Sequence, residues 1–163
     1  MEAKDFRSVA ESFVAFVDES AEGPRDPLVR ELERRIAELY VAALSLPQPG
    51  ELRSTQPTSS MRHDEAASLM RRLSRQLGDY DFYNLVFDPY DFVDSTPVTG
   101  SLADDVTDIY RDLKDGLVAY DAGETEDAVW EWRFEFDSHW GRHAANALYA
   151  IHVLTIDRLG GHF

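Results

Sequence analysis

The stretch AVWEWRFEFDSHWGRHAANAL, residues 128–148, decides the fold of this 163-residue chain. Side chains recur in it at steps of three and four residues, the spacing of one helix face: Trp132, Phe136, His139, His143 and Ala147. At about 100° per residue, both histidines point within about 20° of the Trp132 direction. We therefore predict a helix from about 125 to 159, with Gly141 as a place for a bend. Trp132, Phe136 and Trp140 are predicted to belong to the core.

The same periodicity predicts further helices toward the N-terminus. A capping box at Ser101 and Asp104 opens a helix that runs to about Tyr120. Three other apolar stripes predict helices over about 6–22, 26–46 and 63–77. Hydrophobic residues make up 44% of the chain, which is enough to form a core. The sequence therefore predicts an all-α fold, a single-domain bundle of five to six helices over residues 1–163.

Two segments lack this helical pattern. Residues 47–60, PQPGELRSTQPTSS, are rich in proline, serine and threonine and predict a mobile loop within the domain. Residues 79–94, DYDFYNLVFDPYDFVD, are rich in aromatic and aspartate side chains. We predict a short helix up to Phe87, followed by an irregular turn from Asp88 and Pro89. No stretch alternates with a period of two, so no strand is predicted.

Charge and composition exclude several classes of protein. The chain carries 31 acidic and 16 basic residues, and 18 of the acidic but 5 of the basic ones lie in residues 78–163. A surface this acidic repels nucleic acid and anionic membranes. The absence of cysteine excludes disulfides and thiolate metal sites. The chain shows neither a signal peptide nor an apolar run of about 18 residues, so we expect no membrane association and a cytoplasmic location.

Three segments together resemble a known family. They read LGDYDFYNLVFDP, SLADDVTDIYRDLKDGL and AVWEWRFEFDSHWGRHAANAL, and the HWGRH sequence within the last is the most distinctive. They resemble the bacterial family named domain of unknown function 5063, over roughly residues 10–155. The resemblance implies a helical, single-domain bacterial protein without an assigned reaction, and it supplies no catalytic residues.

His139 and His143 are the strongest candidates for a chemical site. Histidines four residues apart on a helix can share a divalent transition-metal ion when carboxylates arrive from a neighbouring helix. Helix geometry turns Asp105 and Asp112 of the preceding helix inward and Asp108 toward solvent. Glu135 flanks the histidine face. The candidate metal ligands are therefore His139, His143, Asp105, Asp112 and Glu135.

An alternative interpretation of the histidine pair needs no metal. Both can be core residues that hydrogen-bond to Asp105, Asp112 or Tyr110 across the helix pair. The zinc-protease motif HExxH is absent, because Trp140 follows His139 where the glutamate is required. We favour the metal-free interpretation and predict no cofactor. It requires Asp105 or Asp112 to lie within hydrogen-bonding reach of one histidine.

Three functions stay open. The first, which we favour, is a non-enzymatic protein that binds a basic partner protein through the acidic and aromatic surface around 79–94 and 104–115. The second is a metal-binding bundle, and the third is a small-molecule pocket lined by aromatic side chains. A homo-oligomer is compatible with the apolar back of the last helix. The candidate residues for a ligand or partner surface are Tyr80, Tyr83, Asp88, Asp91, Asp108, Trp132 and Trp140.

Overall fold

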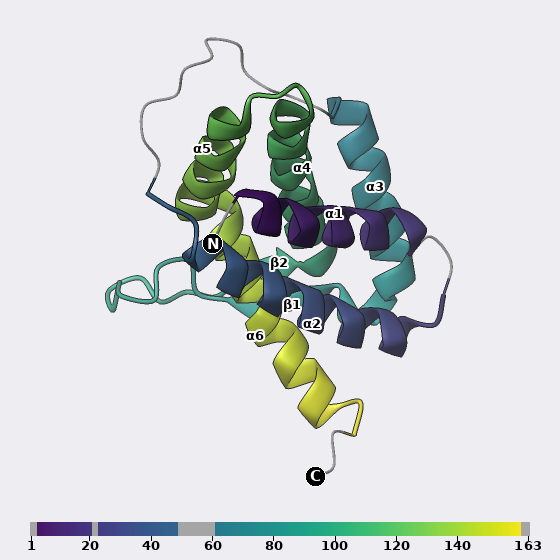
Figure 1. Ribbon diagram of the computed structural model, residues 1–163. Helices are drawn as coiled ribbons and strands as arrows, with labels where there is room; N and C mark the ends of the chain where they lie inside the picture. The colour runs from purple at the N-terminus through teal and green to yellow at the C-terminus, as the bar shows by residue number, and fades with distance from the viewer. Residues whose placement is uncertain (1–2, 21–22, 49–60, 161–163) are drawn as a thin grey trace.

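The computed structural model describes residues 3–20, 23–48 and 61–160. Six α-helices make up most of these residues: α1 (Ala3–Glu19), α2 (Arg25–Leu44), α3 (His63–Leu77), α4 (Leu102–Asp121), α5 (Thr125–Glu135) and α6 (Gly141–Asp157) (Figure 1). Shorter elements lie between them: the 3-10 turn η1 (Gly78–Tyr80), the strands β1 (Phe82–Leu85) and β2 (Val98–Ser101), and the π-helical turn η2 (Phe136–Trp140). The predicted bundle of five to six helices is confirmed.

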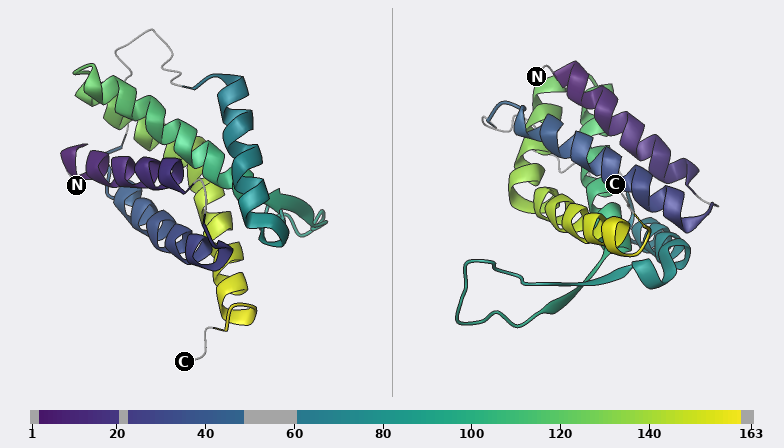
Figure 2. Two further views of the ribbon diagram at one scale, coloured as in Figure 1. Left: turned by 90° about the vertical axis from the view of Figure 1, so that its right-hand side faces the viewer. Right: turned by 90° about the horizontal axis from the view of Figure 1, so that it is seen from below.

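Helix α4 lies at the centre of the bundle. It packs against α1, α3, α5 and α6, and the crossing of these helices is visible from two further directions in Figure 2. Trp132 of α5 is fully buried against α4, where its Nε1 donates to the Leu113 carbonyl oxygen at 3.1 Å. The two helices approach closely because Gly116 carries no side chain; a Cβ there would lie 2.2 Å from Trp132 Nε1. Trp132, Phe136 and Trp140 are buried, as predicted.

The start of α4 is fixed by two side chains. Ser101 Oγ accepts a hydrogen bond from the Asp104 backbone N–H at 3.2 Å, which confirms the predicted N-cap. The buried carboxylate of Asp81 accepts from the Ala103 backbone N–H at 2.9 Å and from the hydroxyls of Ser101 and Ser74. Asp81 therefore ties together the end of α3, the second strand and the first turn of α4.

The predicted helix over 125–159 is interrupted by the wide turn η2. A π-helical turn holds one residue more than an α-helical turn and changes the direction in which later side chains point. Gly141 makes this turn sterically feasible, because a Cβ at this position would lie 2.3 Å from the Phe136 carbonyl oxygen. The turn begins at Phe136, before the bend expected at Gly141. It shifts His139 and His143 from the predicted centre of the buried stripe to its edge, where both are partly exposed.

Residues 82–101 form an antiparallel hairpin, which corrects the prediction of a short helix up to Phe87. Phe82 pairs with Ser101 and Leu85 with Val98. Side chains of β1 alternate between exposed and half-buried, as expected for a strand with one covered face. The pairing was hidden in the sequence because the strands are short and the intervening residues 86–97 form a long loop. That loop projects away from the helices (Figure 2).

Two sequence-based expectations concern other parts of the chain. The mobile loop predicted over 47–60 falls, except for residues 47 and 48, outside the described residues, so that prediction stays a prediction. None of the helices described in residues 3–20, 23–48 and 61–160 has both the length and the apolar character required to cross a bilayer.

Candidate metal centre

Two histidine–aspartate pairs join α4 to the segment formed by η2 and α6, a contact that we call the seam. His139 Nδ1 lies 2.6 Å from Asp112 Oδ2, and His143 Nδ1 lies 2.7 Å from Asp105 Oδ1. Both aspartates are buried, whereas both imidazoles are partly exposed. The prediction that Asp105 or Asp112 lies within hydrogen-bonding reach of one histidine is confirmed, and in the structure each aspartate holds one histidine. Tyr110, the other partner considered, donates to Asp18 instead.

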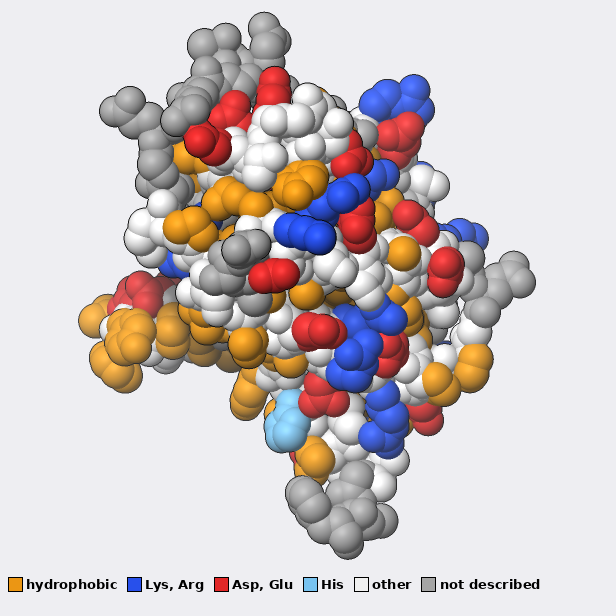
Figure 3. Space-filling model, viewed as in Figure 1, with side chains coloured by type: hydrophobic (Ala, Val, Ile, Leu, Met, Phe, Trp, Pro, Cys, Tyr) orange, Lys and Arg blue, Asp and Glu red, His pale blue; other side chains and the backbone are white. Residues whose placement is uncertain are grey.

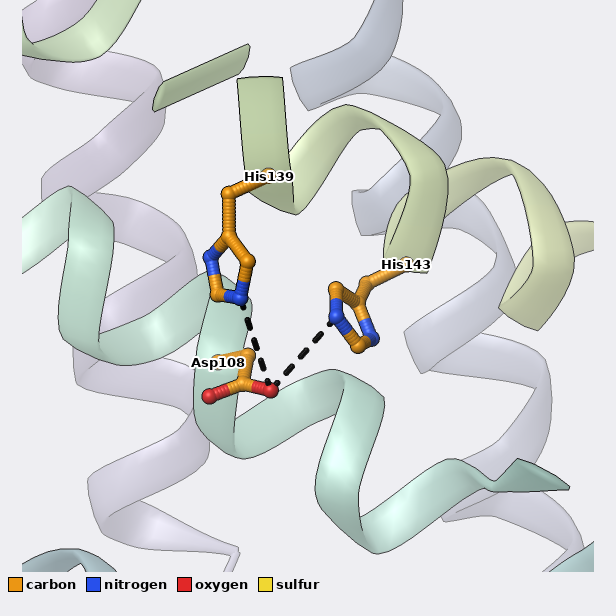
Figure 4. Close-up of side chains that lie close together, drawn as sticks. All are labelled: Asp108, His139 and His143. Atoms are coloured by element: carbon orange, nitrogen blue, oxygen red, sulfur yellow. Dashed lines mark ion pairs between the residues drawn. The ribbon is translucent and has the colours of Figure 1, made fainter. Parts of the chain in front are cut away.

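Asp108 lies between the two imidazoles, not toward solvent as predicted (Figure 4). Its Oδ2 is 3.6 Å from His143 Nε2 and 4.0 Å from His139 Nε2. Its other oxygen, Oδ1, lies 3.0 Å from the Arg111 guanidinium. The side chain of Asp108 is 17% exposed. The carboxylate is therefore partly buried, and its orientation is fixed by the arginine one turn further along α4.

The tautomers of the two histidines follow from these contacts. An ionised carboxylate only accepts hydrogen bonds, so each Nδ1 carries the proton that its aspartate binds. In a neutral imidazole, Nε2 is then unprotonated and carries a lone pair. Both lone pairs face the same negatively charged oxygen of Asp108, with no hydrogen bond between them at 3.6 and 4.0 Å. With both imidazoles neutral, this arrangement is repulsive, and protons on the imidazoles or a bound cation would remove the repulsion.

A second group of donors adjoins the first. Single donor atoms of Asp112, Glu135 and His139 lie within 4.8 Å of one another, as do those of Asp108, His139 and His143. Burial raises the pKa of Glu135, and the neighbouring charge of Asp112 raises it further. Burial likewise raises the pKa of Asp112, although its hydrogen bond with His139 opposes the shift. The seam is thus a partly buried region with an excess of carboxylates.

The hairpin contacts the seam through Tyr83. Its hydroxyl donates to Asp105 Oδ2 at 2.6 Å, so Asp105 uses one oxygen for the tyrosine and the other for His143. Burial and this hydrogen bond raise the pKa of the Tyr83 phenol. The hydrogen bond to Asp105 also raises the pKa of His143, against the opposing effect of burial. The strand β1 is therefore connected to the histidine centre by a continuous chain of hydrogen bonds.

A cleft of about 950 Å³ opens beside the seam, between α3, the hairpin and α6. Asp81 and Asp105 are the buried residues of its lining, and His139 and His143 line it as half-buried side chains. This volume is in the range of small-molecule sites in proteins. The histidine pair is therefore accessible from solvent through a cavity large enough for an organic ligand.

The predicted aromatic pocket is not formed as expected. Trp132 and Trp140 are fully buried in the core, so neither can line a ligand or partner surface. Tyr80 and Tyr83 border a smaller cavity of about 330 Å³ on the other side of β1. The aromatic wall of the large cleft consists of Phe82 and Phe87, which the sequence analysis did not select.

The sequence did contain a signal for Asp108. Asp105, Asp108 and Asp112 are spaced at three and four residues, which places all three on one face of α4. Asp108 was predicted to face solvent because its direction around the helix axis differs from that of the apolar stripe of α4. Arg71 and Arg75 of α3 and Arg142 of α6 also line the cleft. They carried no comparable signal in the sequence, because these two helices are brought to one cavity only by the tertiary fold.

The seam and the cleft define a helical domain with a histidine–carboxylate centre beneath a ligand-sized cavity. The chain belongs to the family described as domain of unknown function DUF5063, whose profile matches residues 1–157. The family resemblance seen in the sequence is therefore confirmed.

The fold is similar to a solved structure, that of protein BF1032 from Bacteroides fragilis. The two chains superpose with a TM-score of 0.79 at 21% sequence identity, over 97% of this chain and 94% of the other. At this identity the likeness shows the fold alone. A search of curated proteins finds no similar sequence.

Proposed function

We propose that this protein binds a divalent transition-metal ion between Asp108 and the two histidines His139 and His143, which line the large cleft. The observation that carries the proposal is the convergence of both Nε2 atoms on Asp108 Oδ2, at 3.6 and 4.0 Å. These distances are too long for hydrogen bonds, which weaken beyond about 3.2 Å. They suit three ligands around one ion better than two protonated imidazoles bound to one carboxylate.

The dimensions and donor types support a metal. Zinc bonds of about 2.0 Å place tetrahedral ligand atoms about 3.3 Å apart, so small side-chain rotations would bring these three donors to that spacing. Two imidazoles and one carboxylate suit zinc, iron, nickel or manganese better than calcium. Three protein ligands leave a further position for water or an organic ligand.

The outer contacts support the same proposal. A metal-binding histidine usually donates its other ring N–H to a carboxylate, which fixes the tautomer and the ring orientation. Asp112 holds His139 in this way, and Asp105 holds His143. Both buried aspartates would therefore act as supporting groups, while Asp108 and the two histidines supply the ligands. This replaces the sequence-based assignment of Asp105 and Asp112 as ligands.

A thermal melt of chelator-treated protein with and without zinc or manganese tests the proposal. A metal at about 100 times its Kd stabilises the folded state by about 2.7 kcal/mol, which raises the Tm by about 5–10 °C in a domain of this size. We expect this rise for the wild type. His143→Gln and Asp108→Asn should lose it, and Asp112→Asn should bind the metal about 10–100 times more weakly.

The chain offers a matched control in His152, another histidine beside a carboxylate. His152 is exposed, and its Nδ1 lies 3.2 Å from Glu33 on α2, away from the cleft. His152→Gln should keep the full metal response. A wild-type Tm that does not respond to any of these metals, or an equal response in His143→Gln and wild type, would overturn the proposal.

We propose a second function, binding of a basic partner protein, for the hairpin tip, by which we mean residues 86–97. Tyr90, Phe92 and Val93 are 84%, 87% and 98% exposed, and Figure 3 shows hydrophobic side chains gathered on this protruding loop at the left. Exposed aromatic side chains grouped on one loop are typical of partner-binding surfaces. Asp88, Asp91 and Asp94 lie among them, which favours a partner with an apolar pocket bordered by lysine or arginine.

A photo-crosslinking amino acid at Phe92 tests this second proposal in producing cells. Val41, which is 65% exposed on α2, is the control position. We expect one discrete adduct with a basic protein from position 92, displaced by excess peptide of residues 86–97, and none from position 41. Identical adducts from both positions, an adduct with an acidic protein, or an adduct that the peptide does not displace would contradict it.

A further inference from the structure

Three arginines surround the mouth of the large cleft. Arg71 and Arg75 extend from α3 and Arg142 from α6, and all three line the cavity and are exposed. Asp105 is buried, and His139 and His143 are half-buried residues of the same lining. The cleft therefore carries three exposed arginines together with the carboxylates of Asp81, Asp104 and Asp105.

These arginines have no carboxylate partner within residues 3–20, 23–48 and 61–160. Arg75 Nε donates to the backbone oxygen of Arg71 at 3.3 Å, and Arg142 lies over the ring of Phe87 at 5.1 Å. Arg34, by contrast, contacts two glutamates of its own helix. Arg25 lies over the ring of Tyr80, and Arg30 and Arg72 donate to backbone oxygens, but none of these three lines the cleft. In a chain with nearly twice as many acidic as basic residues, three unpaired guanidinium groups around one cavity are available for an external anion.

An apolar wall lies beside the arginines. Phe82, Leu85, Phe87 and Val98 of the hairpin line the same cavity. Phe82 is 66% and Phe87 is 68% exposed, although both are large hydrophobic side chains. Apolar side chains exposed inside a concave cavity mark a ligand site more often than a solvent surface.

We propose that the cleft binds a small organic oxyanion. The ligand would carry one phosphate or carboxylate group and an apolar body. The oxyanion group binds Arg71, Arg75 and Arg142, and the apolar body packs on Phe82 and Phe87. A ligand that also extends to the two histidines would contact the metal between His139, His143 and Asp108. Only this contact with the metal rests on the function proposed above.

The size and charge of the protein favour a small molecule over a polymer. A nucleic acid requires an extended basic surface, whereas the formal charge of this chain is −15. Guanidinium groups bind phosphate and carboxylate in the same forked geometry, so the arrangement selects an oxyanion without deciding between the two. The cavity of about 950 Å³ can enclose most of a ligand with one ring and one anionic group.

Isothermal titration calorimetry with three matched probes tests the proposal. The probes are phenyl phosphate, phenylacetate and the neutral benzyl alcohol, titrated into metal-free and into zinc-loaded wild-type protein. We expect at least one of the two anions to bind at least ten times more tightly than benzyl alcohol in both forms. The tighter anion identifies the preferred oxyanion. Equal affinity for benzyl alcohol and both anions would overturn the proposal.

Variants separate the arginines from the metal. Arg71→Gln combined with Arg142→Gln should weaken the preferred anion at least tenfold, while the control Arg34→Gln should leave it unchanged. The double variant should keep the metal-induced rise in Tm, which shows that it is folded and that the two sites are distinct. His143→Gln should lose the metal response and still bind the anion. An unchanged anion affinity in the folded double variant would refute the anion site without affecting the metal proposal.

Discussion

The seam and the hairpin tip use the same residue type in opposite ways. In the seam, Asp105 and Asp112 are buried and hold histidines of another helix. In the hairpin tip, Asp88 and Asp91 are exposed and accept hydrogen bonds from backbone N–H groups two or three residues further on. These backbone hydrogen bonds also lower the pKa of Asp91. Aspartate therefore organises long-range structure in one region and local turns in the other.

The difference shows where the molecule is rigid and where it offers side chains to a partner. In the seam, Asp105 and Asp112 are buried, and Trp140, which follows His139, is fully buried in the core, so the seam is anchored by packing. The hairpin tip is supported by its own turns and by the two short strands. Substitutions that affect one region and leave the other unchanged test this separation.

Trp132→Ala should have the largest effect. Truncation of a buried aromatic side chain costs about 3–5 kcal/mol, because it leaves a cavity behind the seam and removes the hydrogen bond to Leu113. The Tm should fall by about 10 °C or more. Phe92→Ala in the hairpin tip should change the stability by less than about 0.5 kcal/mol. Equal losses in the two thermal melts would contradict the separation of the two regions.

Gly141→Ala should have the next largest effect. The added methyl group would meet the Phe136 carbonyl oxygen at 2.3 Å, and overpacking of this kind costs about 1–3 kcal/mol. Because the clash lies within η2, it should also displace His139 from Asp112 and abolish the metal response. Gly23→Ala is the control, since its nearest neighbour is at 3.9 Å. A metal response that survives in Gly141→Ala would show that the wide turn does not position the histidines.

Tyr83→Phe tests the connection between the hairpin and the seam. It removes the hydrogen bond to Asp105, and a hydrogen bond to a charged group contributes about 1.5–3 kcal/mol. We expect a loss near the lower value, because Asp105 keeps its contact with His143. Chemical denaturation measures the loss. Tyr90→Phe, which changes an exposed tyrosine of the hairpin tip, should leave the free energy of unfolding unchanged; a comparable loss there would contradict the connection.

Glu131→Gln should have the smallest effect, and its sign depends on pH. Burial raises the pKa of Glu131 to about 7, with further contributions from Glu135, Asp115, Asp112 and Asp127. The folded state therefore holds this proton more tightly than the unfolded state, so stability falls as the pH rises from about 4.5 to 7. At pH 8 the variant should melt a few degrees higher than the wild type, and at pH 4 it should not. A pH-independent difference between the two melts would contradict the shift.

The helices were predictable because their apolar spacing and end signals are local. The boundaries of α3 and the Ser101 N-cap depend on residues within a few positions of one another, and both were predicted correctly. The hairpin was missed because its strands hold four residues each, and the pairing of Phe82 with Ser101 spans a long loop. A short strand leaves too few residues to establish a period of two.

The candidate site was predictable in part. The spacing of His139 and His143 and the inward direction of Asp105 and Asp112 correctly predicted contact between these residues, but not which aspartate holds which histidine. The predicted direction of Asp108 was wrong. The prediction compared its direction around α4 with that of the apolar stripe, and did not consider where the two histidines lie. The wide turn η2 was not predicted either, since α-helical and π-helical turns share the same residue preferences. Local spacing could therefore identify the members of the seam but not their final directions.

The extra residue in η2 also sets the direction in which the side chains of α6 point. One residue adds about 100° of rotation to everything that follows it in a helix. A π-helical turn contains one residue more than an α-helical turn, so η2 rotates His143 relative to α5. Deleting Ser138, an exposed residue of η2, should restore an uninterrupted helix and turn His143 away from Asp105. The histidine centre therefore depends on the presence of this one additional residue.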